Sequence, residues 1–307
     1  FREASPINSY EDLSPLIDRI ARGEKNVLWL GKLLYFAKTS GTTSGTKYIP
    51  LTKEMLQNQI KASKEALLLY AYNNKKYNAI DGKMMFLQGS PVLKKHKKIY
   101  TGRLSGIVAH HIPSFLKSNR LPSLKTNSIK SWEEKLEKII EETLNSDLRL
   151  IGGIPPWVIM YFQKVLEKSN QKSIPKVFPN LSLYVHGGVN FKPYKNTLEK
   201  LLPGVDFLEY YPASEGFIGY QDDITKNELL LLTNHGIFYE FIDSQDFING
   251  SYNRISLDEV VMDKNYVLIL NTCSGLWSYN IGDTIKFVNL NPYRVVVTGR
   301  VKHFISA

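Results

Sequence analysis

The sequence is poor in cysteine and contains no long apolar run. Cys273 is the single cysteine among 307 residues, which excludes an internal disulfide and fits a reducing compartment such as the cytosol. A transmembrane helix needs about 20 consecutive apolar residues, and no segment approaches that length. The chain begins at Phe1 without a basic stretch followed by an apolar one, so we expect no signal peptide.

Signatures of several enzyme classes are also missing. The six histidines form no H-E-x-x-H pattern and stand beside no cysteine, which argues against a zinc site. Ser40 lacks the G-x-S-x-G context of a serine hydrolase. No internal repeat and no low-complexity linker is present. The composition that remains is globular, with 43% hydrophobic and 12% aromatic residues.

Positive charge is in excess, with a formal net charge of +10. The basic residues are spread along the chain, and the one dense run, residues 94–98 (K-K-H-K-K), is predicted to be a solvated loop. No arginine and aromatic interleaving surrounds this run, so a nucleic-acid binder is the least favoured class. We expect neither a nucleic-acid nor a membrane partner, and the charge suffices to attract anionic substrates.

The most informative segment is a polar loop within residues 37–50, rich in glycine, serine and threonine and carrying Lys47. Its glycines let backbone N–H groups approach phosphate oxygens, its hydroxyls donate further bonds, and its lysine adds a charge. An apolar stretch, residues 33–36, precedes it as a predicted strand, and Thr52 follows as the N-cap of a predicted helix. Strand, loop and helix in this order are typical of a nucleotide site.

The spacing within this loop is not that of a Walker A motif. Three residues separate Gly41 from Gly45, and Thr46 stands between Gly45 and Lys47. A P-loop kinase or GTPase is therefore disfavoured. Taken alone, the loop is also compatible with a polar surface turn, because serine, threonine and glycine gather in turns for local reasons.

Apolar periodicity predicts alternating helices and strands up to about residue 220. The predicted helices cover residues 11–22 after the N-cap Ser9, 52–72, a segment opened by a capping box at Ser131 and Glu134, and 155–168. The predicted strands cover residues 84–87, 148–151, 183–185 and 207–210. This alternation predicts α/β layers with parallel pairing. Gly41, Gly187 and Ser214 follow predicted strands, so we expect them to border one crevice.

After about residue 220 the pattern becomes rich in strands. Residues 229–233 and 237–242 predict a hairpin with its turn at residues 234–236. Residues 266–270, 284–288 and 294–298 add strands with no helical pattern between them. We therefore expect a β-rich, barrel-like subdomain here.

Four motifs follow the loop in a fixed order. They are residues 185–189 (V-H-G-G-V), 210–216 (Y-Y-P-A-S-E-G), 275–283 (G-L-W-S-Y-N-I-G-D) and 299–302 (G-R-V-K). With the loop at residues 39–47, they make the chain resemble the auxin-responsive acyl-acid amido synthetases. That family is a branch of the adenylate-forming superfamily, which includes acyl-CoA synthetases and luciferase. The resemblance covers essentially the whole chain, with one departure at Ser278, where the branch usually has arginine.

The resemblance implies a fold, a domain organisation and a reaction. The fold would be a layered adenylate-forming N-terminal domain of αβαβα type. Residues 1–220 would bind nucleotide and acyl group, and residues 221–307 would form the β-rich subdomain that ends at a hinge. The small C-terminal domain of the family would be absent, and we expect the chain to be truncated at both ends. The reaction would be ATP-dependent adenylation of a small carboxylic acid, then transfer to an amino acid amine.

The resemblance also implies site residues and cofactors, namely ATP and Mg²⁺. Lys47 and Glu215 would be catalytic, with Glu215 as the metal ligand and Lys302 at the hinge. The nucleotide would be bound by Thr39, Ser40, Gly41, Thr42, Thr43, Ser44, Gly45, Gly187, Gly188, Tyr211, Ser214, Asp283 and Arg300. Two alternatives stay open: an acyl-CoA ligase of the same superfamily, and a nucleotide-binding protein without catalysis.

Overall fold

Parallel strands form the centre of the chain, as the alternating pattern predicts. The computed structural model describes residues 2, 5–40, 45–112 and 118–301. In these residues an 11-stranded sheet and a four-stranded sheet are formed. The large sheet has the order β12 (Ile237–Asp243), β13 (Asn265–Thr272), β14 (Tyr279–Leu290), β15 (Tyr293–Arg300), β11 (Leu229–Leu231), β10 (Phe217–Tyr220), β9 (Asp206–Pro212), β8 (Leu183–Gly187), β7 (Leu148–Gly153), β3 (Lys83–Leu87) and β6 (Arg120–Leu121).

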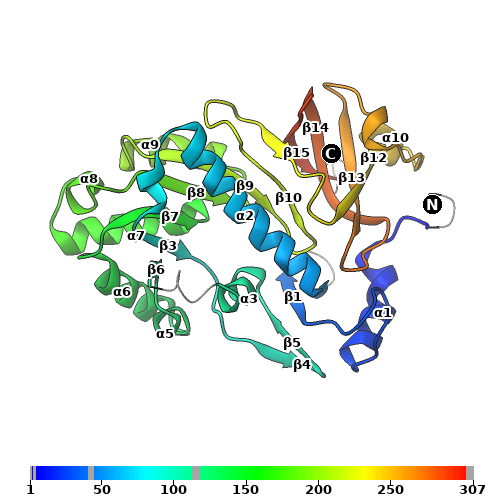
Figure 1. Cartoon of the computed structure of the whole chain (residues 1–307), viewed down its shortest axis with the longest axis horizontal. Coiled ribbons are helices and arrows are strands. Elements are labelled where there is room, and N and C mark those ends of the chain that lie inside the picture. Colours follow the sequence, from blue (N-terminus) through cyan, green and yellow to red (C-terminus); the bar gives the residue numbers. More distant parts are fainter. Residues whose placement is uncertain (1, 3–4, 41–44, 113–117, 302–307) are drawn as a thin grey trace.

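Helices cover both faces of the parallel part, which comprises β6, β3, β7, β8 and β9. One face packs on α2 (Lys53–Asn73) through Tyr70 and Ala71, and the other packs on α6 (Trp132–Thr143) and α7 (Pro155–Ser169). Figure 1 shows α2 crossing the sheet diagonally. The other described helices are α1 (Tyr10–Ala21), α3 (Leu104–His110), α5 (Leu124–Asn127), α8 (Ile174–Val177), α9 (Lys195–Leu201) and α10 (Ser244–Ile248). The predicted α/β layers are therefore confirmed.

Helix starts follow the predicted caps. The side chain of Ser9 accepts from the backbone of Asp12 in a complete capping box, and Thr52 accepts from the backbone of Met55. At Ser131 the cap forms, because the hydroxyl accepts from the backbone N–H of Glu134. The predicted capping box is wrong, since the described structure has no return bond from Ser131 N–H to the Glu134 side chain, and the hydroxyl donates to Glu133. No described helix is long and apolar enough to cross a membrane.

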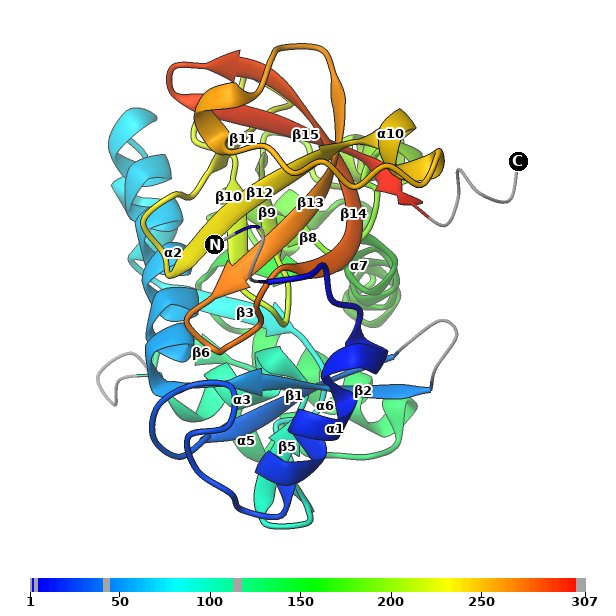
Figure 2. The ribbon, with the colours of Figure 1, turned by 90° about the vertical axis from the view of Figure 1, so that its right-hand side faces the viewer.

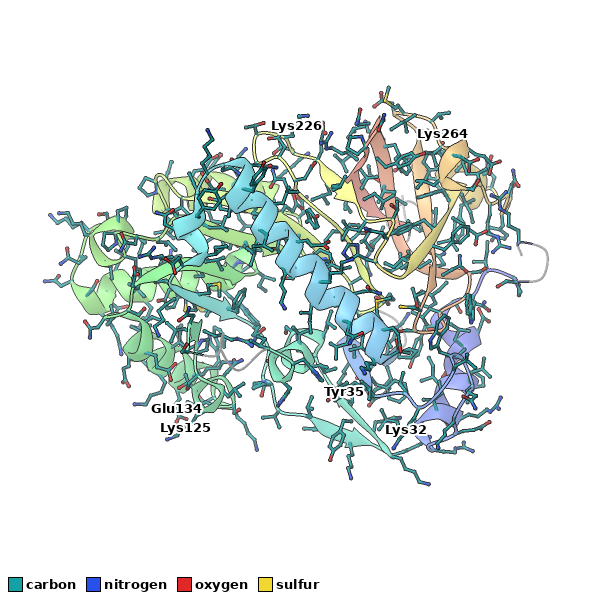
Figure 3. The ribbon with its side chains drawn as sticks, in the orientation of Figure 1. Lys32, Tyr35, Lys125, Glu134, Lys226 and Lys264 are labelled. Carbon is teal, nitrogen blue, oxygen red and sulfur yellow. The ribbon has the colours of Figure 1, made fainter. Side chains whose placement is uncertain are left out.

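The four-stranded sheet contains three strands that the sequence analysis did not predict. Its order is β2 (Thr46–Leu51), β1 (Tyr35–Ser40), β5 (Ile99–Gly102) and β4 (Lys94–His96). The three unpredicted strands are β2, β4 and β5. The basic run at residues 94–98 is thus a β-hairpin and not a loop, because Ile99 is buried and its strand pairs with β1. Figure 3 shows Lys125, Lys226 and Lys264 at separate places on the periphery, in keeping with the spread of positive charge.

The last strands extend the large sheet. β11 pairs with β10 and β15, whereas β12 pairs with β13, so the predicted hairpin between residues 229–233 and 237–242 is wrong. The connecting residue His235 is buried, and its Nε2 lies 2.9 Å from Glu65 of α2, so the connection packs against the helix. The β-rich part is present, but in the described sheet β12 and β6 are the two end strands and do not pair with each other, so it is not closed as a barrel.

His186 of β8 is a buried titratable group near the end of a parallel strand. Its ring stacks on Phe191 at 3.8 Å between centroids, and its Nδ1 has no hydrogen-bond partner in the described part of the chain. Burial lowers the pKa of His186 from 6.5 to about 4. The fold therefore favours the neutral imidazole.

His186 should make the protein sensitive to acid. Above pH 6.5 this imidazole is neutral in both the folded and the unfolded chain and takes nothing from the stability. As the pH falls from 6.5 towards about 4, the unfolded chain binds a proton that the folded chain does not, so the folded state loses stability. His186→Phe keeps a ring on Phe191 and removes this titration. Between pH 7 and pH 4 the free energy of unfolding of the variant should therefore fall by about 3 kcal/mol less than that of the wild type, as measured by thermal unfolding. His96→Phe, at a partly exposed ring stacked on Tyr48, is the matched control and should keep the acid loss. Parallel curves for wild type and His186→Phe would contradict this assignment.

Candidate functional site

Two parallel strands end side by side at the edge where the sequence predicts a ligand. β8 pairs with β9 so that Gly187 lies opposite Tyr210. Beyond β9, Ala213 and Gly216 exchange backbone hydrogen bonds of 2.9 and 3.3 Å, so Ser214 and Glu215 form a two-residue turn into β10. Gly187 and Ser214 therefore lie at the same edge of the sheet. Gly41, the third residue expected there, lies outside the described residues.

The two glycines at 187 and 188 are required for different reasons. A Cβ at position 187 would lie 2.2 Å from the carbonyl oxygen of Tyr210, so only glycine permits the two strands to approach. Gly188 has φ +77° and open space around it, so its backbone conformation is the constraint. Together they present bare backbone at the end of β8, where Gly187 lies opposite Tyr210 of β9.

Asp283 connects three strands at this site. Its position on β14 is paired with Arg300 of β15, and the two side chains form an ion pair of 2.9 Å between Arg300 Nε and Asp283 Oδ1. The hydroxyl of Tyr211 on β9 donates to Asp283 Oδ2 at 2.7 Å. Burial, and then the charge of Asp283, raise the pKa of Tyr211, so this hydroxyl remains a donor.

Glu215 lies within the same electrostatic cluster. Burial raises its pKa to about 7, and the charge of Asp283 adds to the rise. A backbone hydrogen bond opposes the rise, as do the positive charges of Lys47 and Arg300. The structure thus brings together Lys47, Glu215, Asp283 and Arg300, which the sequence separates by up to 253 positions, from residue 47 to residue 300.

The predicted order of strand, loop and helix is wrong in one respect. A second strand, β2, stands between the loop and α2, and it pairs with β1 so that Thr39 lies opposite Lys47. The strand forms because Ile49 and Leu51 are fully buried in the core. Lys47 therefore projects from a β-hairpin. Gly41, Thr42, Thr43 and Ser44 of the loop, and the hinge residue Lys302, lie outside the described residues.

Two tyrosines belong to the cluster that the sequence analysis did not assign. Lys47 Nζ lies 5.1 Å from the ring centroid of Tyr10, and Tyr279 is buried where the charges of Glu215 and Arg300 act on its hydroxyl. Tyr279 stands inside the motif at residues 275–283, which could have pointed to it. No sequence feature links Tyr10 to Lys47, because they are 37 positions apart in different elements.

An arginine from another part of the chain contacts the side chain at position 278. Ser278 is fully buried with φ +47°, and the guanidinium of Arg254 donates to its hydroxyl. The same guanidinium pairs with the buried Glu240 at 3.2 Å. A positive group therefore lies beside position 278 although the residue there is serine.

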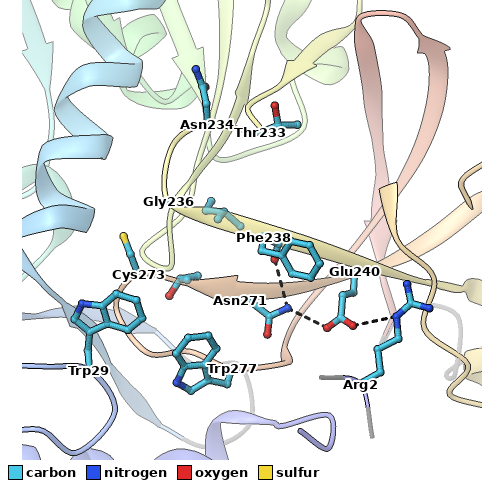
Figure 4. Close-up of a pocket in the computed structure, with 12 residues that line it drawn as sticks. Arg2, Trp29, Thr233, Asn234, Gly236, Phe238, Glu240, Asn271, Cys273 and Trp277 are labelled. Carbon is cyan, nitrogen blue, oxygen red and sulfur yellow. Dashed lines mark hydrogen bonds and ion pairs between the residues drawn. The ribbon is translucent and has the colours of Figure 1, made fainter. Parts of the chain in front are cut away.

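A separate cavity of about 1040 Å³ opens beside β12 and β13. Figure 4 shows Trp29, Trp277, Phe238 and Cys273 around it, with Glu240 between Asn271 and Arg2. None of the predicted site residues lines this cavity. The predicted residues lie at the strand ends described above.

The fold is that of adenylate-forming enzymes. The GH3.15 acyl acid amido synthetase matches 96% of this chain and 61% of its own with a TM-score of 0.76 and 16% identity. A 2-hydroxyisobutyryl-CoA ligase in complex with 2-HIB-AMP and CoA matches 96% of this chain and 64% of its own, with a TM-score of 0.60 and 13% identity. At these identities the likeness concerns the fold.

The sequence then defines the family. Residues 1–91 and 90–207 match the GH3 family N-terminal domain, and residues 230–300 match the GH3 family central domain. The chain belongs to the GH3 family. It is 24% identical over 353 residues to jasmonoyl–L-amino acid synthetase JAR4 of Nicotiana attenuata, covering 93% of this chain. The probable indole-3-acetic acid-amido synthetase GH3.1 of Arabidopsis thaliana is also 24% identical, over 354 residues. The chain spans 60% and 58% of the length of these relatives.

The charged neighbours of Glu215 should shift its pKa. Asp283→Asn removes a negative charge that raises the pKa of Glu215, so that pKa should fall below about 7. Lys47→Met removes a positive charge that lowers it, so that pKa should rise. Carboxyl ¹³C NMR, with the Glu215 signal identified by its loss in Glu215→Gln, measures both shifts. Movement in the same direction for both variants would show that the cluster is not arranged as described.

Proposed function

We propose that this chain carries the nucleotide- and acyl-binding part of an ATP-dependent acyl-acid amido synthetase. A carboxylate oxygen of a small acid bonds to the α-phosphorus of ATP and pyrophosphate leaves, which gives acyl-AMP. The amine of an amino acid then bonds to the acyl carbon, loses a proton and releases AMP, which gives an amide. The observation that carries the proposal is the convergence of Lys47, Glu215 and Asp283 on one cluster in a GH3 family member.

The β1–β2 hairpin is assigned to the pyrophosphate side of ATP. Thr39, the loop residues 40–45 and Lys47 supply hydroxyls, glycines and an ammonium. Gly45 has φ +75°, a backbone conformation that side chains rarely adopt. Hydroxyls and backbone N–H groups at such a turn donate to phosphate oxygens, and Lys47 adds a point charge. Ser214, beside Glu215 in its turn, is assigned to the same phosphates.

The nucleoside is assigned to the ends of β8, β9 and β14. The bare backbone of Gly187 and Gly188, with Tyr211 on the neighbouring strand, suits a flat adenine ring. Asp283 is assigned to the ribose hydroxyls. Its two oxygens accept one contact each, from Tyr211 and Arg300. Because a carboxylate offers about four acceptor sites, two remain for the ribose.

Glu215 is assigned to Mg²⁺. The described residues contain no group of three or more His, Cys, Asp or Glu side chains that could hold a metal by themselves. A single carboxylate fits Mg²⁺ nevertheless, because this ion is commonly held by one or two carboxylates together with substrate phosphates. When bound, the metal would neutralise charge on the phosphates. Lys47 and Arg300 would share this task, and the chain would act by positioning and electrostatics.

The proposal also assigns a role to each part of the chain and a cellular compartment to the protein. Residues 1–220 would bind nucleotide and acid, and residues 221–307 would complete the site and lead to the hinge at Lys302. The single cysteine supports a reducing compartment such as the cytosol. An acyl-CoA ligase shares the adenylation step, but membership of the GH3 family favours an amine as the acceptor.

Three measurements test the proposed function. Calorimetry should detect magnesium-dependent ATP binding by the 307-residue chain. ATP–pyrophosphate exchange by the protein, over a panel of aryl and alkyl acids, should depend on one class of acid. Product analysis with amino acids and with coenzyme A then separates amide from thioester. A chain that binds no ATP in the presence of Mg²⁺ would refute the proposal.

Lys47→Ala should reduce the affinity for ATP more than the affinity for AMP. The lysine is assigned to the outer phosphates, which AMP lacks, and a hydrogen bond to a charged group is worth about 1.5–3 kcal/mol. Calorimetry of both nucleotides on wild type and variant measures the difference. Equal losses for ATP and AMP would remove Lys47 from the phosphate site.

Asp283→Asn should lower the affinity for both ATP and AMP, because both nucleotides carry the ribose. The loss of a charged acceptor should cost on the order of 1.5–3 kcal/mol of binding free energy. Asp147→Asn, at a carboxylate paired with Arg149 before β7 and outside the cluster, is the matched control and should leave nucleotide affinity unchanged. Unchanged affinity in a folded Asp283→Asn protein would exclude the ribose assignment.

A further inference from the structure

The segment before α1 is attached to the strand that carries Asp283. The backbone N–H of Asn8 donates to Ser278 O, and the N–H of Asn280 donates to Asn8 O, both at 2.9 Å. These bonds make a parallel bridge between Asn8 and Tyr279. Figure 2 shows the N-terminal segment passing beside β14 before it enters α1. Ser9 and Tyr10 are therefore held next to the β14 side of the site.

Tyr10 joins this segment to the β1–β2 hairpin. Its position as the first residue of α1 is fixed by the capping box of Ser9 and Asp12, in which Ser9 N–H donates to Asp12 at 2.8 Å. Its hydroxyl accepts the backbone N–H of Tyr48 at 2.9 Å. The partly buried ring packs against the main core. Tyr10 thus bridges β14, through Asn8, to β2.

The ring of Tyr10 lies under the ammonium of Lys47. Lys47 Nζ is 5.1 Å from the ring centroid, within the range in which the negative face of an aromatic ring attracts a cation. A lysine side chain has four flexible carbons and about 2 kcal/mol of rotamer entropy, so an unrestrained ammonium would occupy many positions. The ring restricts it to a region from which its charge reaches Glu215.

We propose that Tyr10 is a positioning residue for the phosphate site. It holds the ammonium of Lys47 towards the outer phosphates of ATP and couples the β1–β2 hairpin to β14. The inference rests on the proposed function, since it assigns Tyr10 a role in that same site. It predicts that the ring of Tyr10 acts on ATP only through Lys47.

A double-mutant cycle tests this dependence. Calorimetry with Mg²⁺ gives the affinities of Tyr10→Leu, Lys47→Ala and the double variant for ATP and AMP. Tyr10→Leu should lower ATP affinity about fivefold, which corresponds to about 1 kcal/mol, and should leave AMP affinity within about twofold. In the Lys47→Ala background it should have no further effect. Equal losses for ATP and AMP, or a full additional loss in that background, would make Tyr10 a merely structural residue.

A second series keeps the shape of the ring and so protects the test from a folding defect. Tyr10→Phe retains the aromatic face and removes only the hydroxyl that accepts from Tyr48 N–H, so it should keep the ratio of ATP to AMP affinity even if thermal stability falls. Replacement by phenylalanines with increasing fluorination withdraws the negative charge of the face, so this ratio should fall stepwise. A ratio that is insensitive to fluorination would overturn the proposal.

Tyr48→Leu is the matched control. Tyr48 follows Lys47 on the same strand, so its side chain points to the opposite face, where the ring stacks on His96 at 4.0 Å. Tyr48→Leu should lower thermal stability without changing the ATP to AMP ratio. If Tyr48→Leu and Tyr10→Leu lower the ratio equally, a loosened hairpin explains both and Tyr10 has no special role. A wild-type chain that binds neither nucleotide refutes the proposed function itself, whereas normal binding by every Tyr10 variant refutes this inference alone.

Discussion

The pairing of one short strand keeps the whole site together. β11 has three residues, and it lies between β10 and β15, so it joins the parallel α/β part to the antiparallel strands in one sheet. Gly219 of β10 permits this approach, because a Cβ there would lie 2.7 Å from Leu230 O. A paired carboxylate and guanidinium, Asp222 and Arg294, closes the same junction at 2.7 Å. Without this junction Tyr211 of β9 would not contact Asp283 of β14, and the antiparallel strands would not contribute Asp283 and Arg300 to the site.

The charges of the site balance one another only in part. Glu215 and Asp283 face Lys47 and Arg300, and the pKa of Glu215 still rises to about 7 because burial outweighs the positive neighbours. A carboxyl in this state is costly to the fold at neutral and higher pH and is ready to gain from a nearby cation. The same burial makes each of its electrostatic contacts stronger than it would be in water. The site therefore gives up some stability of the free chain in favour of ligand binding.

Helix caps, which depend on residues close together in the chain, were predictable from the sequence. The pairing of strands that lie far apart in the chain was not. Ser9 and Thr52 act as helix caps through residues three positions away, so their role is visible in the sequence. β2 was missed because its first residues are polar and its pairing with β1 depends on the core below. The predicted hairpin at residues 229–242 failed because β11 and β12 have other partners, β15 and β13, which come later in the chain. The family motifs indicated Glu215 and Asp283, whereas the contact of Tyr10 with Lys47 has no sequence pattern.

The arginine beside Ser278 has a consequence for how this chain can change. Arg254 occupies the space next to position 278 and pairs with the buried Glu240, which also lies 3.6 Å from Arg2. An arginine at 278 would add a third guanidinium around this one carboxylate. Position 278 is therefore coupled to position 254: this chain can accept arginine at 278 without loss of stability only if Arg254 is replaced as well.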